Sequence, residues 1–137
     1  MKIYIASSWR NQHAVEMLTD KLEEDYEHEV ISFVRKASSD EGRSNLRFDF
    51  DEWVNSKEGE EKFNYDINGA TKSDLVIYIG PSGKDAAAEI GASFGAGIPV
   101  IGLFAKGEDF GLMRRMIAWF DDYREMLKFI ENRAKEA

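Results

Sequence analysis

The feature that most constrains the fold is the run LVIYI at 75–79, five consecutive apolar residues between two segments with helical patterning. A strand with one face in water alternates apolar and polar residues, so an uninterrupted apolar run is typical of a strand buried on both faces of a parallel sheet. Further strand-like runs stand at 2–6 (KIYIA), 28–33 (HEVISF) and 99–104 (PVIGLF). Helical patterns occupy 11–26, 58–74, 85–97, 109–120 and 121–137.

Strands that alternate with helices are joined by right-handed crossovers, which place helices on both faces of the sheet. We therefore predict a single three-layer α/β domain over residues 1–137, Rossmann-like or flavodoxin-like, with a mainly parallel central sheet and 75–79 as its central strand. Ligands of such sheets bind beyond the carboxyl ends of the strands. The candidate binding loops are 7–11, 35–56 and 80–84, and the polar stretch 35–47 is predicted to be a long loop.

Charge and composition exclude several classes of protein. A net charge of -8 argues against a surface that grips duplex phosphates. Zero cysteines exclude disulfides and thiol catalysis. No stretch approaches the roughly 18 apolar residues of a membrane span, and a strand-like run from Lys2 leaves no room for an export signal. We expect a soluble, cytoplasmic protein that binds neither nucleic acid nor membrane.

The common phosphate and catalytic motifs do not fit. GPSGK at 80–84 has two residues between its glycines where a P-loop has four, and an Asp where that motif has Ser or Thr. The first strand is followed by ASSWRN rather than a glycine-rich dinucleotide fingerprint. His13 and His28, the only histidines, are interpreted as surface positions. We predict no metal and no cofactor.

Two carboxylates among small residues remain as candidates for chemistry. Glu89 follows three alanines in the helix after the central strand, one turn beyond Asp85, which is interpreted as a helix cap. Asp66 lies in the preceding helix at the edge of an apolar stripe that includes Phe63 and Ala70. Two carboxyls that converge on a crevice can act as nucleophile and proton donor. The alternative for Glu89 is an exposed first-turn residue that stabilises the helix dipole.

Three segments, KIYIASSWRN, YDINGATKSDLVIYI and AAAEIGASFGAGIPVIGL, resemble in this order the nucleoside 2-deoxyribosyltransferase-like family, which includes the nucleoside 5'-monophosphate N-glycosidases. The resemblance runs from Lys2 to about Met113. It implies that Glu89 of EIGAS is the nucleophile that attacks the anomeric carbon of a (deoxy)ribose. It implies likewise that Asp66 of DIN is the acid or base that handles the nucleobase, and that Tyr4 orients the nucleophile.

The same resemblance implies a site for the 5'-phosphate in the loop after the first strand. In the branch that cleaves monophosphates, this loop holds the phosphate with a Ser and an Arg, which match Ser8 and Arg10. The substrate-binding residues predicted on this basis are Ser7, Ser8, Trp9, Arg10, Gly80, Ser82, Gly83 and Met113.

Two departures from the family pattern bear on the substrate. Transferases of free nucleosides carry an acidic residue six positions before the nucleophile, where this chain has Gly83. They also take an Asn two positions before a Met from a neighbouring subunit, and this chain has Gly111 before Met113. Both departures favour a monophosphate substrate over a free nucleoside. The resemblance further implies a homodimer or larger oligomer, with Met113 or its neighbours reaching the adjacent subunit's pocket.

The aromatic stretch RFDFDEWVNS offers Phe48, Phe50 and Trp53 for stacking on a base, although a loop packed on the domain is the plainer interpretation. The first functional hypothesis is an N-glycosidase or N-glycosyltransferase that acts on a nucleoside or its 5'-monophosphate through Glu89. One alternative is a non-catalytic, nucleotide-sensing module on the same scaffold. Another is a glycohydrolase of a dinucleotide such as NAD, which requires a longer groove.

Overall fold

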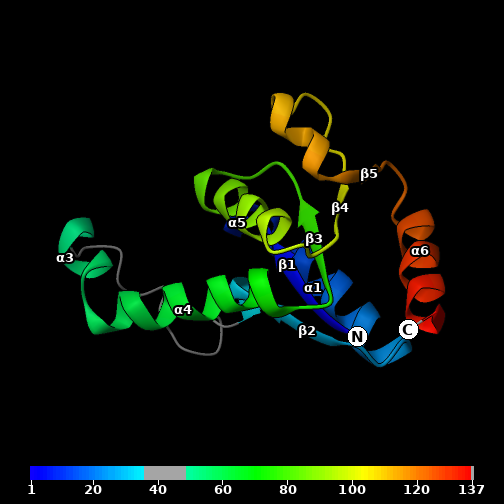
Figure 1. Cartoon of the computed structure of the whole chain (residues 1–137), viewed down its shortest axis with the longest axis horizontal. Helices are drawn as coiled ribbons and strands as arrows, with labels where there is room; N and C mark the ends of the chain where they lie inside the picture. Colours follow the sequence, from blue (N-terminus) through cyan, green and yellow to red (C-terminus); the bar gives the residue numbers. More distant parts are fainter. Residues whose placement is uncertain (36–48, 137) are drawn as a thin grey trace.

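The computed structural model describes residues 1–35 and 49–136 and shows a five-stranded sheet with helices on both faces (Figure 1). The strand order is β2-β1-β3-β4-β5, and every pairing is parallel. The strands are β1 (Lys2–Ala6), β2 (Glu29–Ser32), β3 (Leu75–Ile79), β4 (Val100–Leu103) and β5 (Ala118–Phe120). The α-helices are α1 (Gln12–Asp20), α3 (Phe50–Val54), α4 (Lys57–Lys72), α5 (Lys84–Gly95) and α6 (Tyr123–Glu136). The predicted Rossmann-like fold class is confirmed, with β3 as the central strand.

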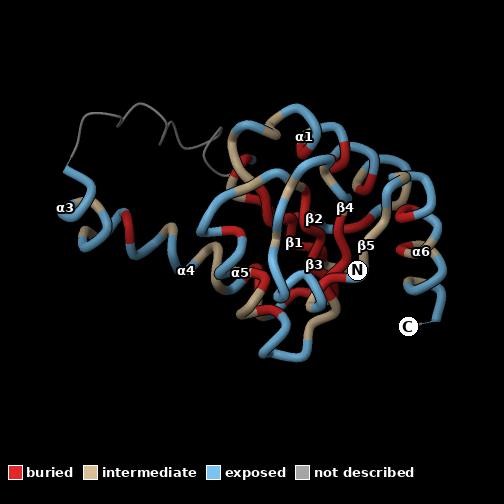
Figure 2. Tube along the Cα trace, turned by 90° about the horizontal axis from the view of Figure 1, so that it is seen from above, coloured by how far each residue is buried: buried red, intermediate tan, exposed pale blue. Residues whose placement is uncertain are grey.

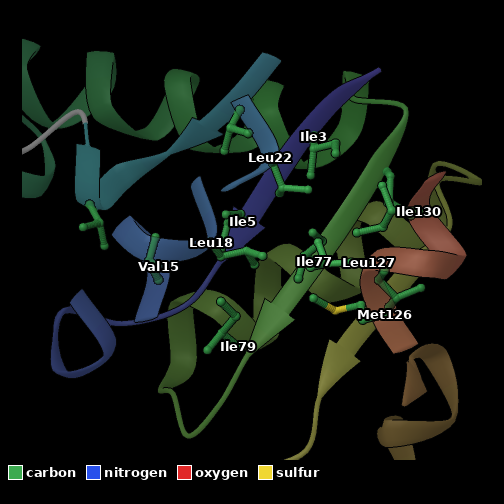
Figure 3. Close-up of a cluster of buried hydrophobic side chains, with 14 residues drawn as sticks. Ile3, Ile5, Val15, Leu18, Leu22, Ile77, Ile79, Met126, Leu127 and Ile130 are labelled. Carbon is green, nitrogen blue, oxygen red and sulfur yellow. The ribbon is translucent and has the colours of Figure 1, made fainter. Parts of the chain in front are cut away.

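Alternation along the strands divides the core into two layers. Ile3 and Ile5 of β1 face α1 and α6, where Leu18 and Ile130 meet them (Figure 3). Tyr4, the residue between them, points to the other face, where α4 and α5 pack. All five residues of β3 are buried, which explains the uninterrupted apolar run in its sequence.

The prediction of a helix over 109–120 is wrong. The chain forms a short 3₁₀ helix, Leu112–Met116, and then β5, which pairs with β4 through Ile101 and Ala118. The Trp119 indole N–H donates to the carbonyl of Arg114, which ties the strand to the preceding turn. Apolar and aromatic residues after the turn favour a strand at an open sheet edge over a further helical turn.

Helix α4 extends beyond the sheet, and α3 lies at its far end (Figures 1 and 2). Asp49 caps α3 by accepting from the Glu52 amide, so part of the segment expected to be a loop is helical. Phe63, expected to face inward, is 64% exposed. The predicted loop over 36–47 and the stacking candidate Phe48 fall outside the described residues.

His28 is buried, contrary to the surface position expected for it. Its Nδ1 lies 2.9 Å from the amino terminus of Met1, and its Nε2 lies 2.7 Å from Glu131 Oε1 on α6. The ring therefore joins the start of β2 to β1 and to the last helix. Across residues 1–35 and 49–136, the helices are too short or too polar to cross a membrane.

Candidate active site

A cavity of about 430 Å³ opens at the carboxyl end of β1, beside the first turns of α5. This is the position expected for the ligand of a doubly wound sheet, because the strand order reverses between β1 and β3. The cavity is lined by Ser7, Ser8, Trp9, Phe33, Phe50, Asp66, Gly83, Lys84, Asp85, Ala86 and Glu89.

The central contact of the site joins Tyr4 to Glu89. The Tyr4 hydroxyl donates to Glu89 Oε1 over 2.5 Å, from the middle of β1 to the second turn of α5. Gly69 of α4 leaves the space for the ring, since a Cβ there would lie 2.3 Å from Tyr4 Cδ1. Tyr4 is fully buried, and its burial beside Asp66 and Glu89 raises its pKa, so the hydroxyl stays a donor.

Burial sets the protonation of both carboxyls. Burial raises the pKa of Glu89 to about 8. The hydrogen bond from Tyr4 lowers this pKa, whereas the charges of Asp66 and Asp85 raise it. Burial also raises the pKa of Asp66 to about 6, with a further contribution from the charge of Asp85. Both groups line one cavity, and the pair holds about one proton between pH 6 and pH 8, mainly on Glu89, whose pKa is the higher.

The loop after β1 is fixed by hydrogen bonds to the loop after β3. Ser7 Oγ donates to the carbonyl of Ile79 over 2.7 Å, and Asn11 Nδ2 donates to Ser7 Oγ and to the carbonyl of Pro81. Ser8 Oγ is buried and has no hydrogen-bond partner within the described residues. Asn11 was not among the predicted site residues, although its place in the candidate binding loop 7–11 could have suggested this anchoring role.

The predicted phosphate residues are divided between the cavity and its surroundings. Ser8 and Gly83 line the cavity, whereas Arg10 is exposed and outside its lining. Gly80 and Ser82 are also outside the lining. The carboxylate of Glu108 packs against Gly80 and accepts a hydrogen bond from Tyr78.

The N-terminus of α5 faces the cavity without a side-chain cap. Its N-cap is Gly83, around whose Cβ position there is open space, and no side chain bonds the first amides. Asp85 is the second residue of the helix and caps nothing, so its interpretation as a cap is wrong. Lys84 lines the cavity and was missed, since the sequence offers it only within a failed P-loop motif.

Aromatic residues form another wall of the cavity. The rings of Trp9 and Phe33 meet edge to face, with centroids 5.7 Å apart. Phe50, a stacking candidate, reaches the cavity from α3, whereas Trp53 is not part of the lining. Phe33 was missed, although its place at the carboxyl end of the second strand was a usable signal.

Met113 lies outside the cavity lining and is 56% exposed. Its predicted contact with an adjacent subunit's pocket stays a prediction. Within the described residues, no group of three or more His, Cys, Asp or Glu side chains is arranged to hold a metal ion.

No family model and no curated protein sequence matches the chain. Among solved structures, it is similar to a 2-deoxyribosyltransferase from Bacillus psychrosaccharolyticus, with 25% identity, a TM-score of 0.62, and coverage of 92% of this chain and 90% of that one. It shares its fold with the Clostridium botulinum CMP N-glycosidase BcmB, at 18% identity, a TM-score of 0.55, and coverage of 96% and 99%. Both neighbours are named as enzymes of N-glycosyl chemistry, and they confirm the resemblance that the sequence motifs indicate.

Proposed function

We propose that the protein is an N-glycosidase or N-glycosyltransferase that cleaves the bond between base and sugar in a nucleoside or a nucleoside 5'-monophosphate. The observation that carries the proposal is the Tyr4–Glu89 hydrogen bond in a cavity that Asp66 also lines. The similar solved structures, named as a deoxyribosyltransferase and a CMP N-glycosidase, support the same reaction class.

The chemistry follows from the two carboxyls. Glu89 Oε forms a bond to the anomeric carbon while the bond from that carbon to the base nitrogen breaks, and its electron pair stays with the base. Because the pKa of Glu89 is the higher of the two, the reacting form is the one in which the shared proton has moved from Glu89 to Asp66, and Asp66 gives this proton to the departing base. Asp66, now a carboxylate, then takes a proton from water or from a second base, which attacks the same carbon and releases Glu89. The sugar becomes cationic between these bonds, and a nearby carboxylate stabilises that charge.

A 5'-phosphate is the finer part of the proposal. The uncapped amides at the start of α5, the open space at Gly83 and the unpaired Ser8 Oγ offer hydrogen-bond donors at one end of the cavity. Lys84 supplies a positive charge beside them. The aromatic wall formed by Trp9 and Phe33 provides apolar surface for a base.

The test is incubation with a panel of nucleosides and nucleoside 5'-monophosphates, with chromatographic detection of free base. Wild-type protein should release base, and Glu89→Gln should lower the rate about a thousandfold or more, because it loses the nucleophile. Glu60→Gln, an exposed change in the first turn of α4, should leave the rate unchanged.

Two results would contradict the proposal. Full activity in Glu89→Gln would show that Glu89 is not the nucleophile. Nucleotide binding that raises the melting temperature without any release of base would favour the sensing module, and release of nicotinamide from NAD alone would favour the dinucleotide hydrolase.

A further inference from the structure

The cavity holds a third carboxylate that the proposed reaction does not use. Asp85 lines it together with Asp66 and Glu89, and stands one helical turn before Glu89 on α5, so both project from the same face of that helix. Asp85 makes no hydrogen bond and no ion pair with residues 1–35 or 49–136. Its charge is therefore not neutralised by a fixed partner.

The charge of Asp85 acts on both reacting carboxyls. After burial, it is the largest influence on the pKa of Asp66, which it raises, and it also raises that of Glu89. Lys62 of α4 opposes it at Asp66, and Tyr4 of β1 opposes it at both carboxyls.

The other titratable groups around the pair are few. Tyr65 of α4 acts on Tyr4, and Lys84 is the one basic residue among the described residues of the cavity lining. The charged neighbours of the pair are thus Asp85 and Lys84 of α5, which line the cavity, and Lys62 of α4, which acts on Asp66.

We propose that Asp85 is an electrostatic positioning residue, whose charge lies beside the Asp66–Glu89 pair in the cavity and stabilises the cationic sugar formed as the glycosidic bond breaks. This role rests on the proposed function. A negative charge beside the cavity stabilises a positive charge that develops on the sugar, and the exposure of Asp85 to water limits the size of this effect. The same negative charge disfavours loss of the proton from the Asp66–Glu89 pair, and the departing base requires that proton.

The test compares Asp85→Asn, which keeps the side-chain shape, with Asp85→Glu, which keeps the charge. In Asp85→Asn, both limbs of the pH profile of kcat/KM should move toward acid by about half a pH unit, and the maximum should fall about threefold. Asp85→Glu should restore both. Glu58→Gln, which removes an exposed first-turn acid from α4, controls for net charge and should move neither limb.

A second measurement separates this inference from the proposed function. Carboxyl ¹³C resonances of Asp66 and Glu89, titrated by NMR in the protein without substrate, report their protonation directly. Acid-shifted titrations in Asp85→Asn support the inference even if no base is ever released. Unchanged titrations, or equal shifts in Glu58→Gln, overturn it whatever the activity.

Discussion

At the scale of single residues, the Tyr4 hydroxyl is the contact on which most of the chemistry depends. It donates to Glu89 from a fully buried ring that cannot turn away. A hydrogen bond to a charged group contributes about 1.5–3 kcal/mol, roughly a ten- to hundredfold effect on a rate. The bond both aims the carboxylate and favours its ionised form.

The pH dependence of the reaction follows from the shared proton. Below about pH 6, both Asp66 and Glu89 are protonated and no nucleophile is available; above about pH 8, both are ionised and no acid remains. The profile of kcat/KM should therefore be bell-shaped, with its maximum between these values. A rate that keeps rising beyond pH 9 would contradict the roles assigned to the pair.

Tyr4→Phe should lower kcat/KM about tenfold and move both limbs toward alkaline pH, because the lost donor favoured the carboxylates. Tyr78→Phe is the matched control, since it removes a second tyrosine hydroxyl from the same face of the sheet, where that hydroxyl bonds Glu108 outside the cavity lining. Its limbs should stay in place. Equal effects of the two substitutions would show that Tyr4 matters only for packing.

At the scale of elements, α4 and β1 are in close contact where Gly69 meets Tyr4. A Cβ at Gly69 would overlap two ring carbons, at 2.3 and 2.6 Å. Gly69→Ala should therefore destabilise the fold by about 1–3 kcal/mol in urea unfolding and lower the rate of base release, because the ring must shift.

Gly91→Ala on α5 is the control for that substitution. Nothing lies within 4 Å of its Cβ position, so alanine should stabilise the helix by about 0.5–1 kcal/mol. Equal stability of Gly69→Ala and wild type would mean that the two elements are not held at this distance.

Elements with a strong local pattern could be predicted from the sequence, and others could not. The run at 75–79 predicts β3 because a strand buried on both faces has consecutive apolar residues, and this run has five. The strand β5 has only three residues and depends on pairing with β4, a contact between segments far apart in the chain. The exposure of Phe63 depends on how α4 packs in the folded protein, and helical periodicity alone does not predict that packing.

At the scale of the whole molecule, the same distinction applies to the candidate site. Tyr4, Asp66 and Glu89 were found through short motifs, and the structure places the first and last in direct contact. The packing of Glu108 against Gly80 and the outward position of Arg10 follow from tertiary arrangement and had no sequence signal. Short motifs thus selected residues that the fold brings together, whereas the arrangement of the surrounding loops depends on tertiary contacts.

Several large apolar side chains of residues 1–35 and 49–136 are exposed, and some of them lie on α3 and α4. The far end of α4 and α3 project beyond the sheet, and Phe63 and Val54 there are 64% and 45% exposed (Figure 2). Short helices in water gain most of their stability from packing of an apolar face. We propose that a second copy of the chain covers this region; the family resemblance also implies a homodimer, but with its contact at Met113 or its neighbours.

Light scattering should then give the mass of a dimer, and Phe63→Ser should give a monomer. Burying a phenylalanine contributes about 1.5–3 kcal/mol, and a two-fold interface counts each residue twice, so the dissociation constant should rise at least about a hundredfold. Met17→Ser, at a residue of α1 that is 66% exposed on the opposite face of the sheet, should leave the dimer intact. A monomeric wild type, or a dimer that survives Phe63→Ser and dissociates with Met17→Ser, would place the interface elsewhere.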